Sequence, residues 1–435
     1  MIYGGDGLAR LPADEKGPGK AAFIPFVLAG EKVEAVIAEQ KTGFSRARAE
    51  SIVEASPHRI KPGCRYFGRC GGCHYQHTSY EHQLEIKKEI LRETLRRTAK
   101  LEPPVEIQVH ASPPWNYRNR SRLNVHLIPE FRAGYFKMGS HELLSVEECP
   151  ISSKLINRGI TVLWQSGRAG KVPVGVDEIE FFTNADDSQL LIEVLASQES
   201  RRAALRAWAE EFRGSLPDIA GIVAFRTQSG SAHAPEKLLT VGADHLTYKT
   251  ARAAYRVSAG SFFQTNRYLT DELVKLVTDG QSGDSALDLY AGVGLFSTAL
   301  GDIRHIFSVE SSQTSTADLA YNLPSNGEPV QATTDQYLSG LDKARREGKN
   351  AVFPHPASRP DLVVVDPPRG GLGERVARML VTLGAPRVVY VSCDPVTLAR
   401  DLVVLLAGGY RMEQLHLVDL FPQTFHLETV VHLAR

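Results

Sequence analysis

The stretch SALDLYAGVGLFSTAL at residues 285–300 decides the fold predicted for the C-terminal part of this chain. An apolar run typical of a buried β-strand ends at Tyr290, and Gly292 and Gly294 follow closely. Glycines in such a place let the backbone turn sharply into a helix and approach a ligand closely. The stretch therefore predicts a strand, a tight turn and a helix, the unit from which parallel sheets are built.

The same alternation continues through residues 251–435. Apolar runs occur in IFSVES, DLVVVDPPRGG and RVVYVSCDP, and helical stretches separate them. This pattern predicts an α/β fold with a doubly wound, mostly parallel sheet. A sheet of this kind binds its ligand at the carboxyl ends of its strands. Because Glu310, Asp366 and Cys393 each fall at such an end, we expect these side chains at the ligand edge.

This edge has the features of a nucleoside site. The Glu310 carboxylate could accept hydrogen bonds from ribose hydroxyls, and the turn before it reads G-x-G-L-F-S. The third glycine of the dinucleotide fingerprint is missing, which favours S-adenosylmethionine over NAD. Pro367 and Pro368 lock the backbone after Asp366 and supply no N–H donor, so they would fix its carboxylate there. A plain glycine turn and a simple Pro-Pro loop are the alternatives.

The composition is typical of a globular protein with more than one domain. The 435 residues include 50 Lys plus Arg and 50 Asp plus Glu, so the net charge indicates no partner. The sequence has no apolar run of about 18 residues, and MIYGGDGLARL lacks a basic or apolar leader. We therefore expect a cytoplasmic protein without a membrane span, in which grouped cysteines bind metal or do chemistry rather than form disulfides.

Two further segments precede the predicted sheet domain. Residues 1–56 carry β-type patterns and predict a small barrel. Residues 57–250 begin with a stretch rich in Gly, Pro, Cys and His, continue with a helix at about 80–98 that we expect to pack on the C-terminal domain, and end in a mixed sheet. Basic and aromatic residues interleave in PPWNYRNRSRLNVH, which suits a phosphate backbone and unstacked bases. A solvated helix beside a polar strand is the alternative.

Four of the five cysteines form a second candidate site. Cys64, Cys70 and Cys73 have the spacing C-x5-C-x2-C, and Cys149 lies far downstream. Four thiolates can hold a [4Fe–4S] cluster or a tetrahedral zinc ion. The residues alone leave a cluster, zinc and no metal open. The fifth cysteine, Cys393, directly follows an apolar run, where a free buried thiol would be the ordinary interpretation.

Together these motifs resemble the RNA uracil-C5 methyltransferase family, whose members make 5-methyluridine in transfer and ribosomal RNA. The matching pieces are SFFQTN (261–266), LDLYAGVGLFS (287–297), VVDPPRGGL (364–372), VSCDP (391–395) and HLETVVHL (426–433). The stretch CRYFGRCGGCHYQH together with ECP resembles the iron–sulfur motif of the family.

The resemblance implies a fold of three parts. Residues 251–435 would form a Rossmann-like, S-adenosylmethionine-dependent methyltransferase domain. Residues 57–250 would form a central mixed α+β domain with the iron–sulfur motif and an RNA-binding surface. Residues 1–56 resemble a TRAM domain, an OB-like RNA-binding barrel.

The resemblance also implies a mechanism that the chemistry of the residues supports. Uracil C5 is too poor a nucleophile to attack a sulfonium methyl group. Addition of a thiolate to C6 gives C5 carbanion character; after methylation a base must remove the C5 proton before the thiolate can leave. By the family motifs, Cys393 is the nucleophile and Glu428 the base. The positions that match cofactor-binding residues are Gln264, Tyr290, Glu310 and Asp366, with Asp335 as a further candidate.

The cluster ligands of the family match Cys64, Cys70, Cys73 and Cys149, which implies a [4Fe–4S] cluster. Methylation needs no electron transfer, so its role would be structural. The TRAM-like segment and the cluster favour 23S ribosomal RNA over transfer RNA as substrate, and a monomer would suffice. Two other functions stay open. One is an RNA cytosine-C5 methyltransferase, whose Pro-Cys motif is absent here; the other is a non-catalytic RNA-binding or RNA-folding module.

Overall fold

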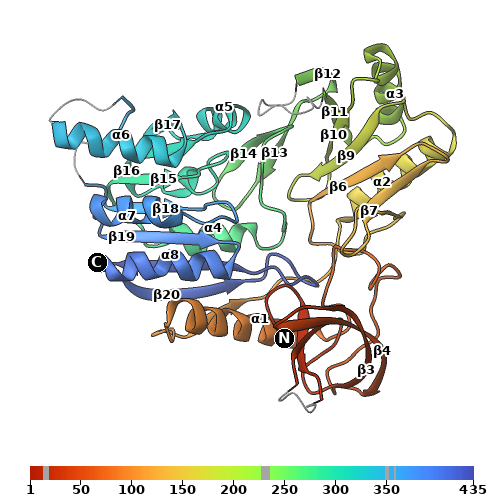
Figure 1. Cartoon of the computed structure of the whole chain (residues 1–435). Helices are drawn as coiled ribbons and strands as arrows, with labels where there is room; N and C mark the ends of the chain where they lie inside the picture. The colour runs from red at the N-terminus through yellow and green to blue at the C-terminus, as the bar shows by residue number, and fades with distance from the viewer. Residues whose placement is uncertain (13–18, 227–235, 348–351, 357–358) are drawn as a thin grey trace.

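The computed structural model places the helices and strands of the chain in three regions, which Figure 1 shows from red at the N-terminus to blue at the C-terminus. The structure describes residues 1–12, 19–226, 236–347, 352–356 and 359–435. Among the helices in these ranges, none combines the length and the hydropathy that crossing a membrane requires.

In the described part of the N-terminal region, the strands form one four-stranded sheet in the order β1-β2-β4-β3. A small apolar core that includes Ala22, Ile24 and Ala47 lies inside the curled sheet (Figure 1). The predicted β-rich N-terminal segment is therefore present. The strands are β1 (Asp6–Arg10), β2 (Ala21–Pro25), β3 (Lys32–Gln40) and β4 (Phe44–Glu54).

The predicted helix follows as α1 (Tyr80–Thr94), which continues into a π-helical turn, Leu95–Ala99. It begins after Ser79, whose side chain accepts a hydrogen bond from the backbone N–H of His82 and so satisfies one free donor of the first turn. The apolar face of α1 belongs to the same core as the C-terminal sheet, with Ile90 and Leu91 buried. The next strand, β5 (Ile107–His110), pairs with that sheet in parallel.

The central region is built on a seven-stranded sheet in the order β12-β11-β10-β9-β6-β7-β8. Helices α2 (Lys154–Arg168) and α3 (Arg202–Gly214) pack on it through buried side chains such as Leu163 and Trp208. A two-stranded hairpin, β13 (His245–Lys249) and β14 (Ala254–Ser258), follows it. The sheet strands are β6 (Arg120–His126), β7 (Arg132–Phe136), β8 (Leu143–Ser145), β9 (Val176–Thr183), β10 (Leu190–Ala196), β11 (Ile219–Arg226) and β12 (Glu236–Gly242).

The C-terminal sheet has eight strands in the order β17-β16-β15-β18-β19-β21-β20-β5. The five strands from β17 to β19 are parallel, and β21 runs antiparallel to both of its neighbours. The predicted doubly wound, mostly parallel α/β sheet is thus confirmed. Its strands are β15 (Gly283–Leu289), β16 (Ile303–Glu310), β17 (Gly327–Gln331), β18 (Leu362–Val365), β19 (Arg387–Ser392), β20 (Arg411–Val418) and β21 (Glu428–Ala434).

Helices cover both faces of this sheet (Figure 1). They are α4 (Thr270–Thr278), α5 (Gln313–Asn322), α6 (Thr334–Glu347), α7 (Gly373–Leu383) and α8 (Pro395–Ala407). From β15 the chain adds β16 and β17 on one side of the sheet, and it then crosses back to add β18 and β19 on the other side. The order of strand addition thus reverses between the neighbouring strands β15 and β18. In an open α/β sheet such a reversal creates a crevice at the carboxyl ends of the strands.

Candidate active site

The strand registers bring the predicted strand-end residues to one edge. Leu289 of β15 lies opposite Val309 of β16 and Val365 of β18, so these strands end at the same level. A cavity of about 830 Å³ opens there. Each of the six side chains predicted for the reaction or the cofactor lines this cavity: Gln264, Tyr290, Glu310, Asp366, Cys393 and Glu428.

The glycine turn after β15 has an unusual backbone. Tyr290, Gly292 and Gly294 have φ values of 66°, 57° and 89°, all in the left-handed region. A Cβ atom on Gly294 would lie 2.8 Å from the Leu319 Cδ1 atom, so a side chain there is also excluded by packing. The two glycines therefore have a structural reason, and the strained conformation of Tyr290 fits a functional position.

Glu310 is held at the cavity wall by backbone donors. The N–H of Gly292 donates to Oε2 at 2.9 Å, and the N–H of Ser312 donates to Oε1 at 2.6 Å. The Ser311 hydroxyl also donates to Oε1, at 3.4 Å. Because a carboxylate oxygen has two lone pairs, Oε2 keeps one for a hydroxyl of a ligand. The sequence predicts a ribose hydroxyl as the ligand group at this position.

Three carboxyl groups lie close together at the floor of this edge. Burial raises the pKa of Asp366 to about 7, and the nearby Asp288 adds to the rise. Burial also raises the pKa of Asp288 to about 7, although Ser297 donates two hydrogen bonds to it. For Glu428, burial and then the charge of Asp366 place the pKa well above its usual range. Near neutral pH these three groups are therefore not fully ionised.

Gln264 lies in the segment between β14 and α4 and contacts one of these carboxyl groups. Its Nε2 atom lies 3.4 Å from Oδ2 of Asp366. Asn119, which directly precedes β6 of the central sheet, donates through Nδ2 to the Gln264 carbonyl at 3.0 Å and so holds this segment. The central region therefore helps to set the position of a cavity side chain.

Cys393 follows β19 and precedes α8, whose first turn is capped by Asp394. The Asp394 carboxylate accepts from the backbone N–H groups of Val396 and Thr397 at 2.9 and 3.0 Å, so it faces the helix. Burial raises the pKa of the half-buried Cys393 thiol to about 12; Glu428 and other carboxylates add to the rise, and Arg369 opposes it. The resting group is therefore a thiol, and Asp394 does not activate it.

The cavity contains side chains for which the sequence indicated no role. Phe262, with 62% of its surface exposed, lies at the wall together with Arg369, Phe421 and His426. The Arg369 guanidinium is 3.3 Å from Nδ1 of His426, and burial together with this cation lowers the His426 pKa to about 3. His426 is thus neutral. Phe262, Arg369 and His426 lie within the sequence motifs, but their spacing gave no chemical reason to select them; Phe421 lies outside the motifs.

Asp335 and two arginines of the predicted RNA-binding stretch contact charged groups of the protein instead of the cavity. Asp335 pairs with Arg375 at 3.0 Å and is not among the residues that line the cavity. In the basic, aromatic stretch, Arg120 and Arg122 both form ion pairs with Glu180, at 3.1 and 2.9 Å. These two cations are therefore committed to contacts within the protein.

The four remaining cysteines lie close enough to influence one another. Burial raises the pKa of Cys70 to about 11, and the neighbouring Cys149 and Cys64 add to the rise. Burial and Cys149 also raise the pKa values of Cys64 and Cys73. Backbone N–H groups point at two of the sulfurs: Tyr66 to Cys64 and Gly72 to Cys70, both at 3.4 Å.

N–H to sulfur contacts of this kind stabilise thiolates that hold a metal, so the donor chemistry of the four sulfurs suits a [4Fe–4S] cluster or a zinc ion. Within the described residues, however, no three His, Cys, Asp or Glu side chains are arranged as a group that could hold a metal ion.

Comparisons with known proteins agree with this geometry. Residues 79–435 match the family model described as tRNA (Uracil-5-)-methyltransferase. An uncharacterized RNA methyltransferase of Aquifex aeolicus is 32% identical over 100% of this chain and 96% of its own length. An uncharacterized RNA methyltransferase of Streptomyces avermitilis is likewise 32% identical over the same shares.

A solved structure has the same fold. The tRNA (uracil-54, C5)-methyltransferase of Pyrococcus abyssi, in complex with S-adenosyl-L-homocysteine, superposes with a TM-score of 0.73 and covers 99% of this chain and 100% of its own, at 23% identity. The C-terminal region thus has the α/β fold of S-adenosylmethionine-dependent methyltransferases. With the family match over most of its length, the chain belongs to the tRNA (uracil-5-)-methyltransferase family and is an S-adenosylmethionine-dependent RNA (uracil-C5) methyltransferase.

Proposed function

We propose that the protein methylates C5 of a uridine in 23S ribosomal RNA, with Cys393 as the nucleophile and Glu428 as the base. The observation that supports these roles is that both side chains line one cavity with the four proposed cofactor-binding residues. The bound S-adenosylmethionine supplies an electrophilic methyl group. Gln264, Tyr290, Glu310 and Asp366 would hold it, with Glu310 at the ribose hydroxyls.

The proposed steps of the chain's own residues follow from the state of the cavity. Because the resting thiol is protonated, Cys393 gives up its proton only within the substrate complex. The uracil O4 oxygen takes up this proton as the sulfur bonds to C6 and the C5–C6 π electrons shift towards O4, and the proton passes to solvent when C5 takes up the methyl group. After C5 has been methylated, Glu428 takes the C5 proton in its ionised form, so the proton that burial favours on this group has to leave before the step. The electrons of that C–H bond re-form the C5–C6 double bond, and the sulfur leaves C6. A target uridine has to leave its base stack to reach this depth.

The choice of ribosomal RNA rests on the N-terminal and cysteine-rich segments. We propose that residues 1–56 form a TRAM-like OB barrel, residues 57–250 the central RNA-binding domain and residues 251–435 the methyltransferase domain. The curled N-terminal sheet supports the first assignment. Transfer RNA is the second candidate, because the Pyrococcus abyssi protein of similar fold is named for uracil 54 of tRNA.

We also propose that Cys64, Cys70, Cys73 and Cys149 hold a [4Fe–4S] cluster with a structural role. The support is the set of four neighbouring thiols and the N–H groups directed at two sulfurs. The cluster would tie the loop that contains Cys64, Cys70 and Cys73 to the segment of Cys149, which comes 76 residues after Cys73 in the sequence.

The first prediction concerns the nucleophile and the RNA. RNA in which 5-fluorouridine replaces uridine should trap the enzyme covalently, because fluorine cannot leave C5 as a proton. We expect an adduct on a gel with 23S ribosomal RNA fragments and less with transfer RNA transcripts. The Cys393→Ala variant should form none with either. A wild-type adduct only on transfer RNA would reverse the choice of substrate, and an adduct of Cys393→Ala would exclude the proposed nucleophile.

The second prediction concerns the base. Glu428→Gln keeps the size of the side chain but cannot take the C5 proton, so the sulfur cannot be expelled after methylation. We expect this variant to accumulate a covalent complex with unmodified RNA, detected by mass spectrometry, while turnover falls by about 100-fold or more. Normal turnover would show that another group removes the proton.

The third prediction concerns pH. Asp366, with a pKa of about 7, is largely neutral below pH 7 and ionised above it. A sulfonium cation binds better beside the ionised form, so the affinity for S-adenosylmethionine should fall as pH decreases from 8 to 6, by up to about tenfold per pH unit. Titration calorimetry with S-adenosylhomocysteine, which has no positive sulfur, is the matched control and should give a weaker pH dependence. Equal pH dependence for both ligands would contradict the proposal.

The fourth prediction concerns the cysteines. Protein purified without oxygen should be brown and contain about four iron atoms per chain. Cys70→Ser should lower the iron content, whereas Cys393→Ser, a change at the remaining cysteine, should leave it unchanged. Stoichiometric zinc without iron would overturn the cluster assignment.

A further inference from the structure

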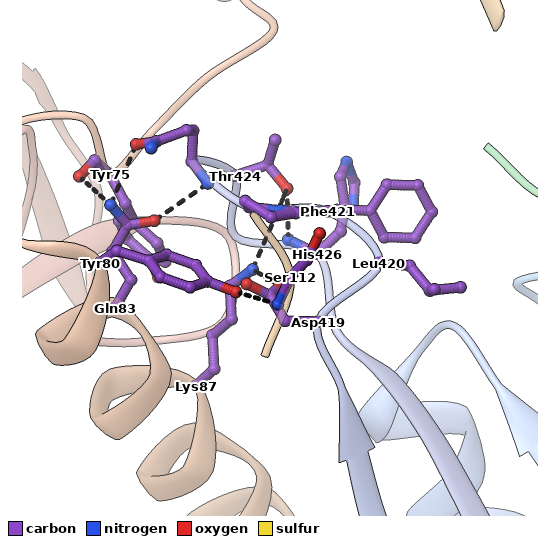
Figure 2. A network of polar contacts seen from close by, with 12 residues as sticks. Tyr75, Tyr80, Gln83, Lys87, Ser112, Asp419, Leu420, Phe421, Thr424 and His426 are labelled. Atoms are coloured by element: carbon purple, nitrogen blue, oxygen red, sulfur yellow. Dashed lines mark hydrogen bonds and ion pairs between the residues drawn. The ribbon is translucent and has the colours of Figure 1, made fainter. Parts of the chain in front are cut away.

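The loop of residues 419–427 joins β20 to β21 at the cavity. Two of its side chains, Phe421 and His426, line the cavity, and Glu428 follows directly as the first residue of β21. Figure 2 shows that this loop lies beside α1, which belongs to a distant part of the sequence. Glu428 itself pairs with Val418 of β20, and the chain that leads into it is this loop.

Gln83 of α1 holds the middle of the loop. Its Oε1 atom accepts from the backbone N–H of Gln423 at 3.0 Å, and its Nε2 atom donates to Oε1 of the same residue at 3.0 Å. The same amide group also donates to the carbonyls of Tyr75 and Thr78, both at 3.1 Å. Gln423 has a φ of 69°, a conformation that a non-glycine residue keeps only when its surroundings fix it.

Lys87, one helical turn further along α1, holds the start of the loop. Its Nζ atom lies 2.6 Å from Oδ1 of Asp419 and donates to the carbonyl of Phe421 at 2.9 Å (Figure 2). Both charged side chains are fully buried. Burying an ion pair is costly, so this one is weak evidence for stability and stronger evidence for a fixed geometry.

The remaining anchors come from outside the hairpin as well. Four consecutive carbonyls of the loop, those of residues 420–423, each accept a hydrogen bond from a group in another part of the chain. The donors are Asn266 Nδ2 to Leu420 (3.1 Å), Lys87 Nζ to Phe421 (2.9 Å), Tyr117 Oη to Pro422 (3.0 Å), and the N–H groups of His74 and Tyr75 to Gln423 (2.8 and 3.0 Å). His74 directly follows Cys73, so the cysteine-rich segment is itself one of the anchors.

We propose that Gln83 and Lys87 are positioning residues, which hold the loop so that Glu428 reaches the C5 proton of the substrate. The inference rests on the proposed role of Glu428 in the reaction. Helix α1 and the cysteine-rich segment then have a function besides contact with RNA, because they set the geometry of a catalytic step. Neither side chain lines the cavity, so their effect passes through the loop.

The test separates positioning from stability by means of a double variant. Lys87→Met alone leaves the buried Asp419 charge without its partner and should destabilise the fold. Lys87→Met combined with Asp419→Leu removes both charges and should restore the melting temperature, but it cannot restore the donor to the Phe421 carbonyl. We expect kcat of the double variant to stay lower by about 10- to 100-fold with the KM for S-adenosylmethionine unchanged.

Two further readouts belong to the same experiment. Amide hydrogen exchange of residues 420–427 should become faster, and a covalent complex with unmodified RNA should accumulate because proton removal is slowed. Gln83→Met keeps the size of the side chain and introduces no charge, but it removes the hydrogen bonds to Gln423. It should give the same pattern. Lys88→Met on the same helix is the matched control, since Lys88 is 3.7 Å from the exposed Glu106, and should behave as wild type.

The outcomes distinguish this proposal from the proposed function. If the double variant and Gln83→Met melt like wild type and also have wild-type kcat, the two residues are structural only and the inference is wrong. If one of these two variants is unstable, the inference is tested in the other variant by amide hydrogen exchange of the loop and by formation of the covalent complex with RNA. If Glu428→Gln itself forms no complex with RNA, the proposed role of Glu428 fails first, whatever Gln83 and Lys87 do.

Discussion

The common level at which the parallel strands end is the constraint on which the site depends. Leu289 lies opposite Val309 and Val365, and Val365 lies opposite Tyr390, so β15, β16, β18 and β19 reach the same edge together. A slip of one residue would turn every side chain of a strand to the other face. Alternate residues of these strands belong to two separate apolar cores, one on each face of the sheet, so a slip would require both cores to repack. The core thus fixes the relative positions of the functional side chains.

The same burial sets the chemistry of the cavity. Carboxyl groups at the edge have raised pKa values, and the thiol beside them is protonated at rest. A protein that stored a free thiolate here would expose a reactive group to oxidants and alkylating agents. In the proposed mechanism the carboxyl groups of the cavity complement a cationic methyl donor. The Cys393 sulfur becomes reactive only when the target uracil is bound.

Much of the C-terminal region could be predicted from the sequence, because its signals are local. A strand that ends in Gly-x-Gly or Asp-Pro-Pro has its functional group next to the break in the pattern, which selects Glu310, Asp366 and Cys393. The resemblance to the family adds Gln264, Tyr290 and Glu428, and all six line one cavity. The contribution of distant segments could not be predicted. Strand β5 lies within the interval 57–250 that we assigned to the central domain, yet it pairs with β20 of the C-terminal sheet. Lysine is almost never fully buried, so nothing in the pattern of α1 separates Lys87 from its partly exposed neighbour Lys88. Arg120 and Arg122 likewise have the composition of an RNA-binding stretch, and only the fold reveals Glu180 as their partner.

The central claim is that a sulfur atom of the protein adds to a uracil ring so that C5 can exchange its hydrogen for a methyl group. The most direct measurement uses RNA labelled with tritium at C5 of uridine and follows its release together with methyl incorporation. The account predicts equal amounts of tritium released and methyl transferred, with both lost when Cys393 is replaced by serine. Methyl transfer that leaves the tritium on the RNA would contradict it.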